Sequence, residues 1–147
     1  YKKPTNGASR EGTCYMVRKG IDKPHIHEED AICLDGKTHS EISKILQTSR
    51  RFISYDEYTA YSLFAVMCGC ESVVVPSKDI SLNEWYPDEK DRYGIAYGIS
   101  NSQLEWAKKT AKLVEERIKS EHKRSVENVR IFLEDANCFF MRNAKDD

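Results

Sequence analysis

A pair of cationic residues followed by a glycine stands directly after the first strand that the sequence predicts. The strand covers residues 13–17, and Arg18, Lys19 and Gly20 follow it. Arg and Lys bind phosphate oxygens through charge-assisted hydrogen bonds. The pair is therefore a candidate phosphate-binding site. The competing interpretation is a solvated strand end, since Lys and Arg are mostly exposed in any protein.

A polar turn, Ser54-Tyr55-Asp56, follows a short strand at 52–53 and leads into a helix over 59–67. In parallel sheets, ligands sit at the carboxyl ends of the strands, where helix N-termini offer free N–H groups to phosphate. We therefore predict that Thr59 and the amides of residues 56–59 form a phosphate cradle. The competing roles are a simple N-cap for Asp56 and core packing for Tyr55.

The sequence offers little for a metal site or a disulfide framework. His25 and His27 form a His-x-His pair, but no carboxylate at a known ligand spacing accompanies them. The cysteines, at positions 14, 33, 68, 70 and 138, are odd in number and irregularly spaced. We therefore predict no metal site, and cysteines that are buried and reduced.

Strands and helices alternate around these residues. The stretch 49–76 predicts a strand, a helix, a stop at Gly69 and a β-branched strand at 72–75, which is a βαβ unit with a right-handed crossover. Upstream, 31–34 predicts a second short strand, and Thr38 with Glu41 has capping-box spacing at a helix start. The order β-β-α-β-α-β indicates an open parallel sheet.

The rest of the chain adds a loop, a strand and two helices. Residues 77–92 are polar, and Ser81 with Glu84 predicts a single capped helical turn. Residues 93–97 predict another strand. One helix begins at Asn101 or Ser102 and extends to Ile118, and a second covers about 125–141. The predicted fold class is α/β, a Rossmann-like open parallel sheet with two C-terminal helices over 101–142.

The last helix carries an apolar stripe that is wide for an element at the end of a chain. Because large exposed apolar patches are unusual on stable monomers, we expect a dimer through Phe139 and Phe140. The alternative is that the helix folds back on its own sheet and buries both rings. The stripe consists of Val126, Val129, Phe132, Leu133, Ala136, Phe139 and Phe140.

Length and composition fit one globular domain. The chain has 147 residues, of which 39% are hydrophobic and 32% charged, and its net charge of −1 gives no general attraction for nucleic acid. No apolar run reaches the roughly 20 residues of a membrane span, and no secretory signal is present. We predict a single domain over 1–147, with residues 1–11 as a flexible lead-in. The predicted location is cytoplasmic, including the inner face of the membrane.

The stretch 54–76, SYDEYTAYSLFAVMCGCESVVVP, resembles the donor-binding half of GT-B glycosyltransferases, particularly enzymes that build bacterial capsule or O-antigen polysaccharide. Many retaining members carry Glu, seven residues and a second Glu, followed by A-M-A-x-G-x-P-V-V. With Cys68-Gly69 set on that pattern, Asp56 takes the first acidic position. The second falls on Phe64, so the ribose-binding carboxylate of those members is missing. RKG at 18–20 and YGIAYG at 93–98 also look similar, and the likeness covers roughly residues 12–118.

The resemblance implies transfer of a sugar from a nucleoside diphosphate donor to a surface glycan, by positioning and by stabilising the departing diphosphate. It implies that Arg18 and Lys19 contact the diphosphate and that Asp56 contacts the sugar. Tyr55 would line the donor pocket, beside Ser54 and Thr59. The nucleotide sugar is the substrate, so no cofactor is expected. The glycan acceptor would bind a separate N-terminal domain outside this chain, and no catalytic residue is identified.

Two other functional classes stay open. A Rossmann-like domain can bind a nucleotide or a protein for regulation without catalysing a reaction, and fold alone does not separate that role from a transferase. A phosphate-accepting receiver domain would need clustered acidic residues at strand ends. Only Asp35 and Asp56 meet that requirement loosely.

Overall fold

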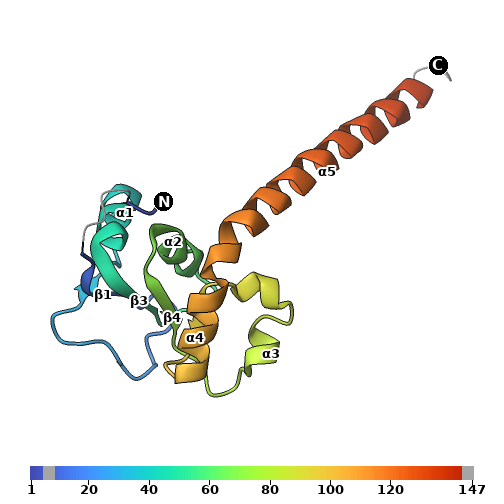
Figure 1. Ribbon diagram of the computed structural model, residues 1–147. Helices are drawn as coiled ribbons and strands as arrows, with labels where there is room; N and C mark the ends of the chain where they lie inside the picture. The colour runs from blue at the N-terminus through green and yellow to red at the C-terminus, as the bar shows by residue number, and fades with distance from the viewer. Residues whose placement is uncertain (5–8, 144–147) are drawn as a thin grey trace. The chain divides into compact units, whose positions relative to one another are not determined.

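The computed structural model describes residues 1–4 and 9–143. Within these residues, five strands form one parallel sheet in the order β2-β1-β3-β4-β5 (Figure 1). The predicted α/β class with a Rossmann-like open parallel sheet is therefore confirmed. The strands are β1 (Glu11–Met16), β2 (Ile32–Cys33), β3 (Ser49–Ser54), β4 (Glu71–Val74) and β5 (Ile95–Tyr97).

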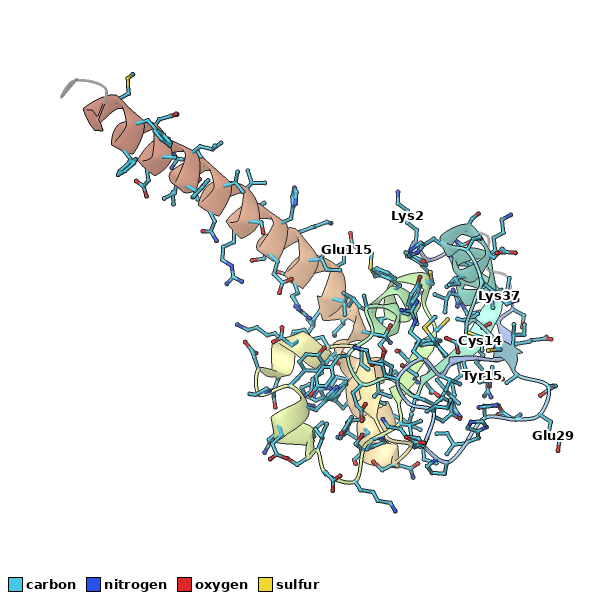
Figure 2. All side chains as sticks on the ribbon, turned by 180° about the vertical axis from the view of Figure 1, so that it is seen from behind. Lys2, Cys14, Tyr15, Glu29, Lys37 and Glu115 are labelled. Atoms are coloured by element: carbon cyan, nitrogen blue, oxygen red, sulfur yellow. The ribbon has the colours of Figure 1, made fainter. Side chains whose placement is uncertain are left out.

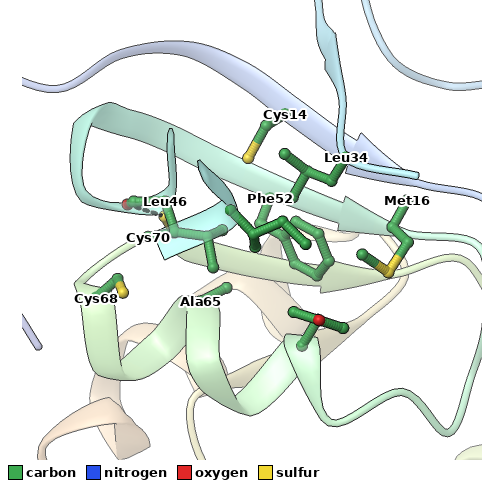
Figure 3. Close-up of a cluster of buried hydrophobic side chains, with 10 residues drawn as sticks. Cys14, Met16, Leu34, Leu46, Phe52, Ala65, Cys68 and Cys70 are labelled. Atoms are coloured by element: carbon green, nitrogen blue, oxygen red, sulfur yellow. Dashed lines mark hydrogen bonds between the residues drawn. The ribbon is translucent and has the colours of Figure 1, made fainter. Parts of the chain in front are cut away.

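Helices cover both faces of the sheet. On one face lie α1 (His39–Thr48), between β2 and β3, and α2 (Tyr61–Cys68), between β3 and β4. The other face is covered by α4 (Asn101–Thr110), which follows β5. Figure 3 shows the core under α1 and α2, where Phe52 lies among Met16, Leu34, Leu46 and Ala65. The core under α4 contains Ile53, Tyr55, Val73, Val75, Ala96 and Ala107.

Local sequence signals explain where these helices begin and end. At the start of α1, Thr38 and Glu41 form the predicted capping box, with the Glu41 amide donating to Thr38 Oγ1 at 3.3 Å. Ser81 and Glu84 form a second capping box at α3 (Leu82–Trp85), also as predicted. Gly69 ends α2 in the left-handed region, with φ of 90°, as the glycine stop indicated.

The central strand is longer than the sequence predicted. β3 begins at Ser49 because its outer residues pair on both sides: Ser49 aligns with Glu11 of β1, and Arg51 aligns with Glu71 of β4. Arg51 and Glu71 also form an ion pair of 2.5 Å. Such a cross-strand charge pair stabilises the start of β3, whose polar residues 49–51 give no strand pattern in the sequence.

The two C-terminal helices divide at a different place from the one predicted. The N-cap of α4 is Ser100, not Asn101 or Ser102. The α-helical geometry breaks at η2 (Ala111–Leu113), and α5 (Val114–Asn143) then runs without interruption through 118–125. Thr110 Oγ1 donates to the Trp106 carbonyl at 2.8 Å and accepts from the Gly94 amide at 2.9 Å. Such side-chain bonding to the preceding turn bends helices, which explains the break at Thr110.

The chain divides into two compact units, residues 1–114 and 115–147. The described part of the second unit is a single helix, so no other element of that unit covers its apolar stripe. Phe139 and Phe140 are 61% and 69% exposed. None of the described helices has the length and apolar character that crossing a membrane requires.

The described residues of the predicted lead-in contact the core, and residues 5–8 lie outside the described part of the chain. Tyr1 stacks on Phe64 with ring centroids 4.3 Å apart. The Arg10 guanidinium donates to the carbonyls of Leu46 at 3.1 Å and Ser49 at 3.0 Å, and also to that of Cys68. Arg10 therefore satisfies carbonyls at the ends of α1 and α2.

The cysteines are all unpaired, but they are not all buried. Cys14, Cys68 and Cys70 lie in the core, whereas Cys33 is half-buried and Cys138 is exposed. Burial raises the pKa of Cys14 to about 11 and that of Cys70 to about 12. These two core thiols therefore stay protonated and unreactive at neutral pH.

Packing against α4 makes Ile53 a strong determinant of stability. Ile53 is 1% exposed, whereas Ile21 is 74% exposed, so the same substitution at Ile21 is a matched control. Ile53→Ala should lower the free energy of unfolding by roughly 2–5 kcal/mol through lost burial and a cavity. Ile21→Ala should change it by less than about 0.5 kcal/mol. Urea denaturation measures both, and equal effects would contradict this core assignment.

Candidate functional site

The sheet order places a topological switch point between β1 and β3. From β1 the chain moves to β2 on one side, and from β2 it crosses over to β3 on the other side. Ligands of open α/β sheets bind at such a point, outside the carboxyl ends of the strands. The sequence-predicted site residues lie at these two strand ends or in the segments directly after them: Arg18, Lys19, Ser54, Tyr55, Asp56 and Thr59.

Arg18 and Lys19 are exposed in the turn after β1. Arg18 has a left-handed φ of 42°, a conformation that is uncommon and strained for a non-glycine residue. Its guanidinium carbon lies 5.1 Å from the ring centroid of Tyr61, the first residue of α2, and its Nε donates to Met16 Sδ at 3.0 Å. No carboxylate in the described part of the chain pairs with Arg18 or Lys19. The cation–π contact thus holds an uncompensated positive charge near the N-terminus of α2.

The turn after β3 is fixed by its own polar side chains. Ser54 Oγ donates to the Asp56 carbonyl at 2.6 Å, and Asp56 Oδ1 accepts from the Tyr58 amide at 3.1 Å. Thr59 Oγ1 accepts from the Tyr61 amide at 3.3 Å, directly before α2. Among the described residues, the amides of Asp56 and Thr59 donate to no protein acceptor. Asp56 therefore orders a turn that leaves these N–H groups open, beside a helix N-terminus.

Tyr55 is fully buried, and its hydroxyl binds the loop that follows β1. The hydroxyl accepts from the Ile26 amide at 2.8 Å and lies 2.6 Å from His27 Nδ1. A Cβ added at Gly20 would lie 2.1 Å from the Tyr55 carbonyl oxygen, so only glycine fits at this crossing. Tyr55 therefore positions the Arg18 turn against the Asp56 turn.

A network that the sequence analysis did not identify joins three strand ends. Lys23, in the loop after β1, lies 2.5 Å from Glu57 Oε1, and both side chains are only 12% exposed. Lys23 also donates to the Val75 carbonyl at 2.6 Å, and Ser77 donates to Glu57. Burial alone would raise the pKa of Glu57, but the hydrogen bonds from Lys23 and Ser77 outweigh it and leave that pKa below its ordinary value. No spacing rule reveals this network, because Lys23 and Glu57 are 34 positions apart in the sequence and Glu57 and Ser77 are 20 positions apart.

The histidine pair stacks against aromatic side chains. His27 lies flat on Tyr15, with ring centroids 3.7 Å apart, and its centroid is 5.0 Å from that of His25. Figure 2 labels Tyr15 on β1 and Glu29 in the loop that follows. Burial lowers the pKa of His27, and His25 lowers it further. In the described part of the chain, no three His, Cys, Asp or Glu side chains are grouped as a metal site requires.

Comparison with known proteins gives no family for this chain: no family matches it, and neither a curated protein nor a solved structure shows significant similarity. The fold alone is compatible with many enzymes and with binding modules. A function therefore has to be argued from the geometry at the strand ends.

The Lys23–Glu57 pair makes a pH-dependent contribution to stability. Because the pKa of Glu57 is depressed in the folded state, its ionised form stabilises the protein at neutral pH. That contribution falls as the pH drops through the ordinary value of 4.5 toward the lower folded-state pKa. Glu57→Gln should cost roughly 1–3 kcal/mol at pH 7, and the difference from the unmodified protein should shrink below about pH 4.5.

Glu105→Gln is the matched control for this measurement, because it removes the same charge from an exposed position on α4. It should change the free energy of unfolding by less than about 0.5 kcal/mol. Denaturation curves collected from pH 3 to pH 7 test the prediction. A difference between Glu57→Gln and the unmodified protein that stays constant across that range would contradict it.

Proposed function

We propose that this chain is the nucleotide-sugar-binding half of a glycosyltransferase, which transfers a sugar from a nucleoside diphosphate to a bacterial surface glycan. The observation that carries the proposal is the convergence of unpaired cationic side chains and open amides at one edge of the sheet. Arg18 lies over Tyr61, at the start of α2, and the open amides of the 56–59 turn directly precede that helix. The resemblance of the stretch 54–76 to GT-B donor domains supports the same assignment.

In this proposal the chain acts on the donor by binding and by charge stabilisation. The Thr59 amide donates to a diphosphate oxygen, and the N-terminus of α2 favours negative charge there. Arg18 and Lys19 offset the charge that develops as the diphosphate departs. Asp56 uses Oδ1 to hold the Tyr58 amide, which leaves Oδ2 to accept from a hydroxyl of the donor sugar.

The acceptor belongs to a different part of the enzyme in this proposal. A GT-B reaction site lies between two Rossmann-like domains, and residues 1–147 supply one of them. The chain alone should therefore bind the donor without transferring its sugar to a glycan. A regulatory nucleotide-binding module is the second candidate, because it would satisfy the same phosphate contacts without any transfer.

Removing the cationic side chains should weaken binding of a nucleoside diphosphate. Arg18→Ala should cost roughly 1.5–3 kcal/mol of binding free energy, since each such contact is a charge-assisted hydrogen bond, and Lys19→Ala should act in the same direction. Arg50→Ala is the matched control, because Arg50 is exposed near the amino end of β3. Calorimetry with uridine and guanosine diphosphates measures all three variants. Unchanged affinity in both Arg18→Ala and Lys19→Ala would remove these residues from the site.

We also infer that α5 associates with a second copy of the chain. Val126, Val129, Leu133, Ala136 and Phe140 follow one another at spacings of three and four, which is the seam of a coiled coil. The large members of this seam are more than half exposed. A helix gains most of its stability from packing of its apolar face, which a second copy provides with the same face.

Light scattering of the intact chain should therefore give the mass of a dimer at micromolar concentration. The double substitution Phe139→Ser with Phe140→Ser should shift the protein to monomer, because it removes the apolar end of the stripe. Ile131→Ser is the control, since Ile131 lies on the opposite side of α5 at 3.6 residues per turn. A monomeric unmodified chain, or a dimer that survives the double substitution, would contradict this inference.

A further inference from the structure

We propose that Tyr58 and Tyr86 form an aromatic ledge on which the base of a nucleotide stacks. The inference rests on the proposed function, because it places the base beside the proposed diphosphate site. Tyr58 belongs to the 56–59 turn and is 56% exposed, although the rest of that turn is half-buried or buried. Its ring centroid lies 5.9 Å from that of Tyr86, with the planes at 75°.

The geometry leaves a flat surface for a ligand. In an edge-to-face pair Tyr86 covers at most one face of the Tyr58 ring, and Tyr58 is 56% exposed, which leaves room for a stacked ring. Tyrosine offers a large, rigid contact surface that loses little conformational entropy on binding. Nucleobases stack on such side chains with little preference for sequence, because every base has a π face.

The ledge is held in place although it is exposed. The Tyr58 amide donates to Asp56 Oδ1 at 3.1 Å, which fixes the backbone that carries the ring. On the other side, Trp85 Nε1 donates to the Glu57 carbonyl at 2.8 Å and so joins α3 to the same turn. Trp85 also stacks on Tyr97 at 4.5 Å, and its ring centroid lies 4.7 Å from that of Tyr86. An exposed ring with this much support is preorganised for binding.

The ledge and the proposed diphosphate site lie close together along the chain. Tyr58 precedes Tyr61 by three residues, and three residues span at most about 11 Å of chain. Arg18 lies over Tyr61, and the open amide of Thr59 directly follows Tyr58 in the chain. A ligand with phosphates on Arg18 and a planar base on Tyr58 would therefore use both features, which is the chemistry of a nucleoside diphosphate.

The test is a titration of the full chain, followed by NMR of the tyrosine ring protons. The probes are uridine, guanosine, their 5′-diphosphates, inorganic pyrophosphate and free glucose. Spectra of Tyr58→Phe assign the Tyr58 signals. We expect upfield ring-current shifts at Tyr58 with at least one nucleoside and its diphosphate, and none with pyrophosphate or glucose. Tyr58→Ala should weaken binding of that nucleoside diphosphate roughly tenfold, while Tyr58→Phe keeps it.

The outcomes separate the ledge from the proposed function. Nucleosides carry no phosphate, so their shifts test the ledge even if the diphosphate site fails. A second outcome is that diphosphates bind through Arg18 while the Tyr58 ring protons do not shift and Tyr58→Ala keeps the affinity. That result would overturn the ledge and still support the diphosphate site. Shifts caused by glucose and not by nucleosides would also overturn the ledge as a base site. If nucleosides shift Tyr58 but pyrophosphate does not bind, the ledge stands and the donor proposal fails.

Discussion

The parallel register between β1 and β3 controls the arrangement of the centre of the sheet. In this register, β1 residues 14–16 align with β3 residues 52–54. Side chains alternate between the two faces of a strand, so a shift by one residue would exchange the two cores. The same register brings the Arg18 turn and the Asp56 turn together. The Tyr55 amide extends the pairing by donating to the Met16 carbonyl at 2.9 Å.

Contacts between the loops after β1, β3 and β4 fix the positions of these loops at one edge of the sheet. Gly20 crosses the Tyr55 backbone with no room for a side chain, and the Tyr55 hydroxyl holds the loop at Ile26 and His27. The Lys23–Glu57 pair then joins the loops after β1 and β3, and Ser77 connects the segment after β4. Lys23 and Glu57 are mostly buried charges, so removing either one would leave the other unpaired and lower the stability of the fold. The exposed groups that remain at this edge include Arg18, Lys19 and Tyr58.

Signals that act within a few residues allowed the fold to be predicted. The capping box at Thr38, the stop at Gly69 and the β-branched run after it are local, so α1, the end of α2 and β4 were found within a few residues. The start of β3 depends on pairing with two other strands, and the break at Thr110 depends on a contact with Gly94. Such long-range contacts leave no pattern in the surrounding sequence.

The candidate site divides in the same way. Arg18, Lys19 and the 54–59 segment could be identified because polar residues directly follow apolar strands. The contacts that Lys23, His27 and Tyr58 make could not be identified, because their partners lie far along the chain. The roles given to Arg18, Lys19, Ser54, Tyr55, Asp56 and Thr59 in nucleotide-sugar binding stay predictions, since the structure supplies their positions and not a ligand.

Amide NMR with inorganic pyrophosphate is the measurement that decides whether phosphate groups bind at the carboxyl ends of β1 and β3. The intact, isotope-labelled chain would be titrated and each backbone amide followed. We expect saturable shifts concentrated at residues 18–20 and 56–61, since these residues surround the proposed site. No saturable shift there, or shifts centred on α4 and α5 instead, would contradict phosphate binding at these strand ends.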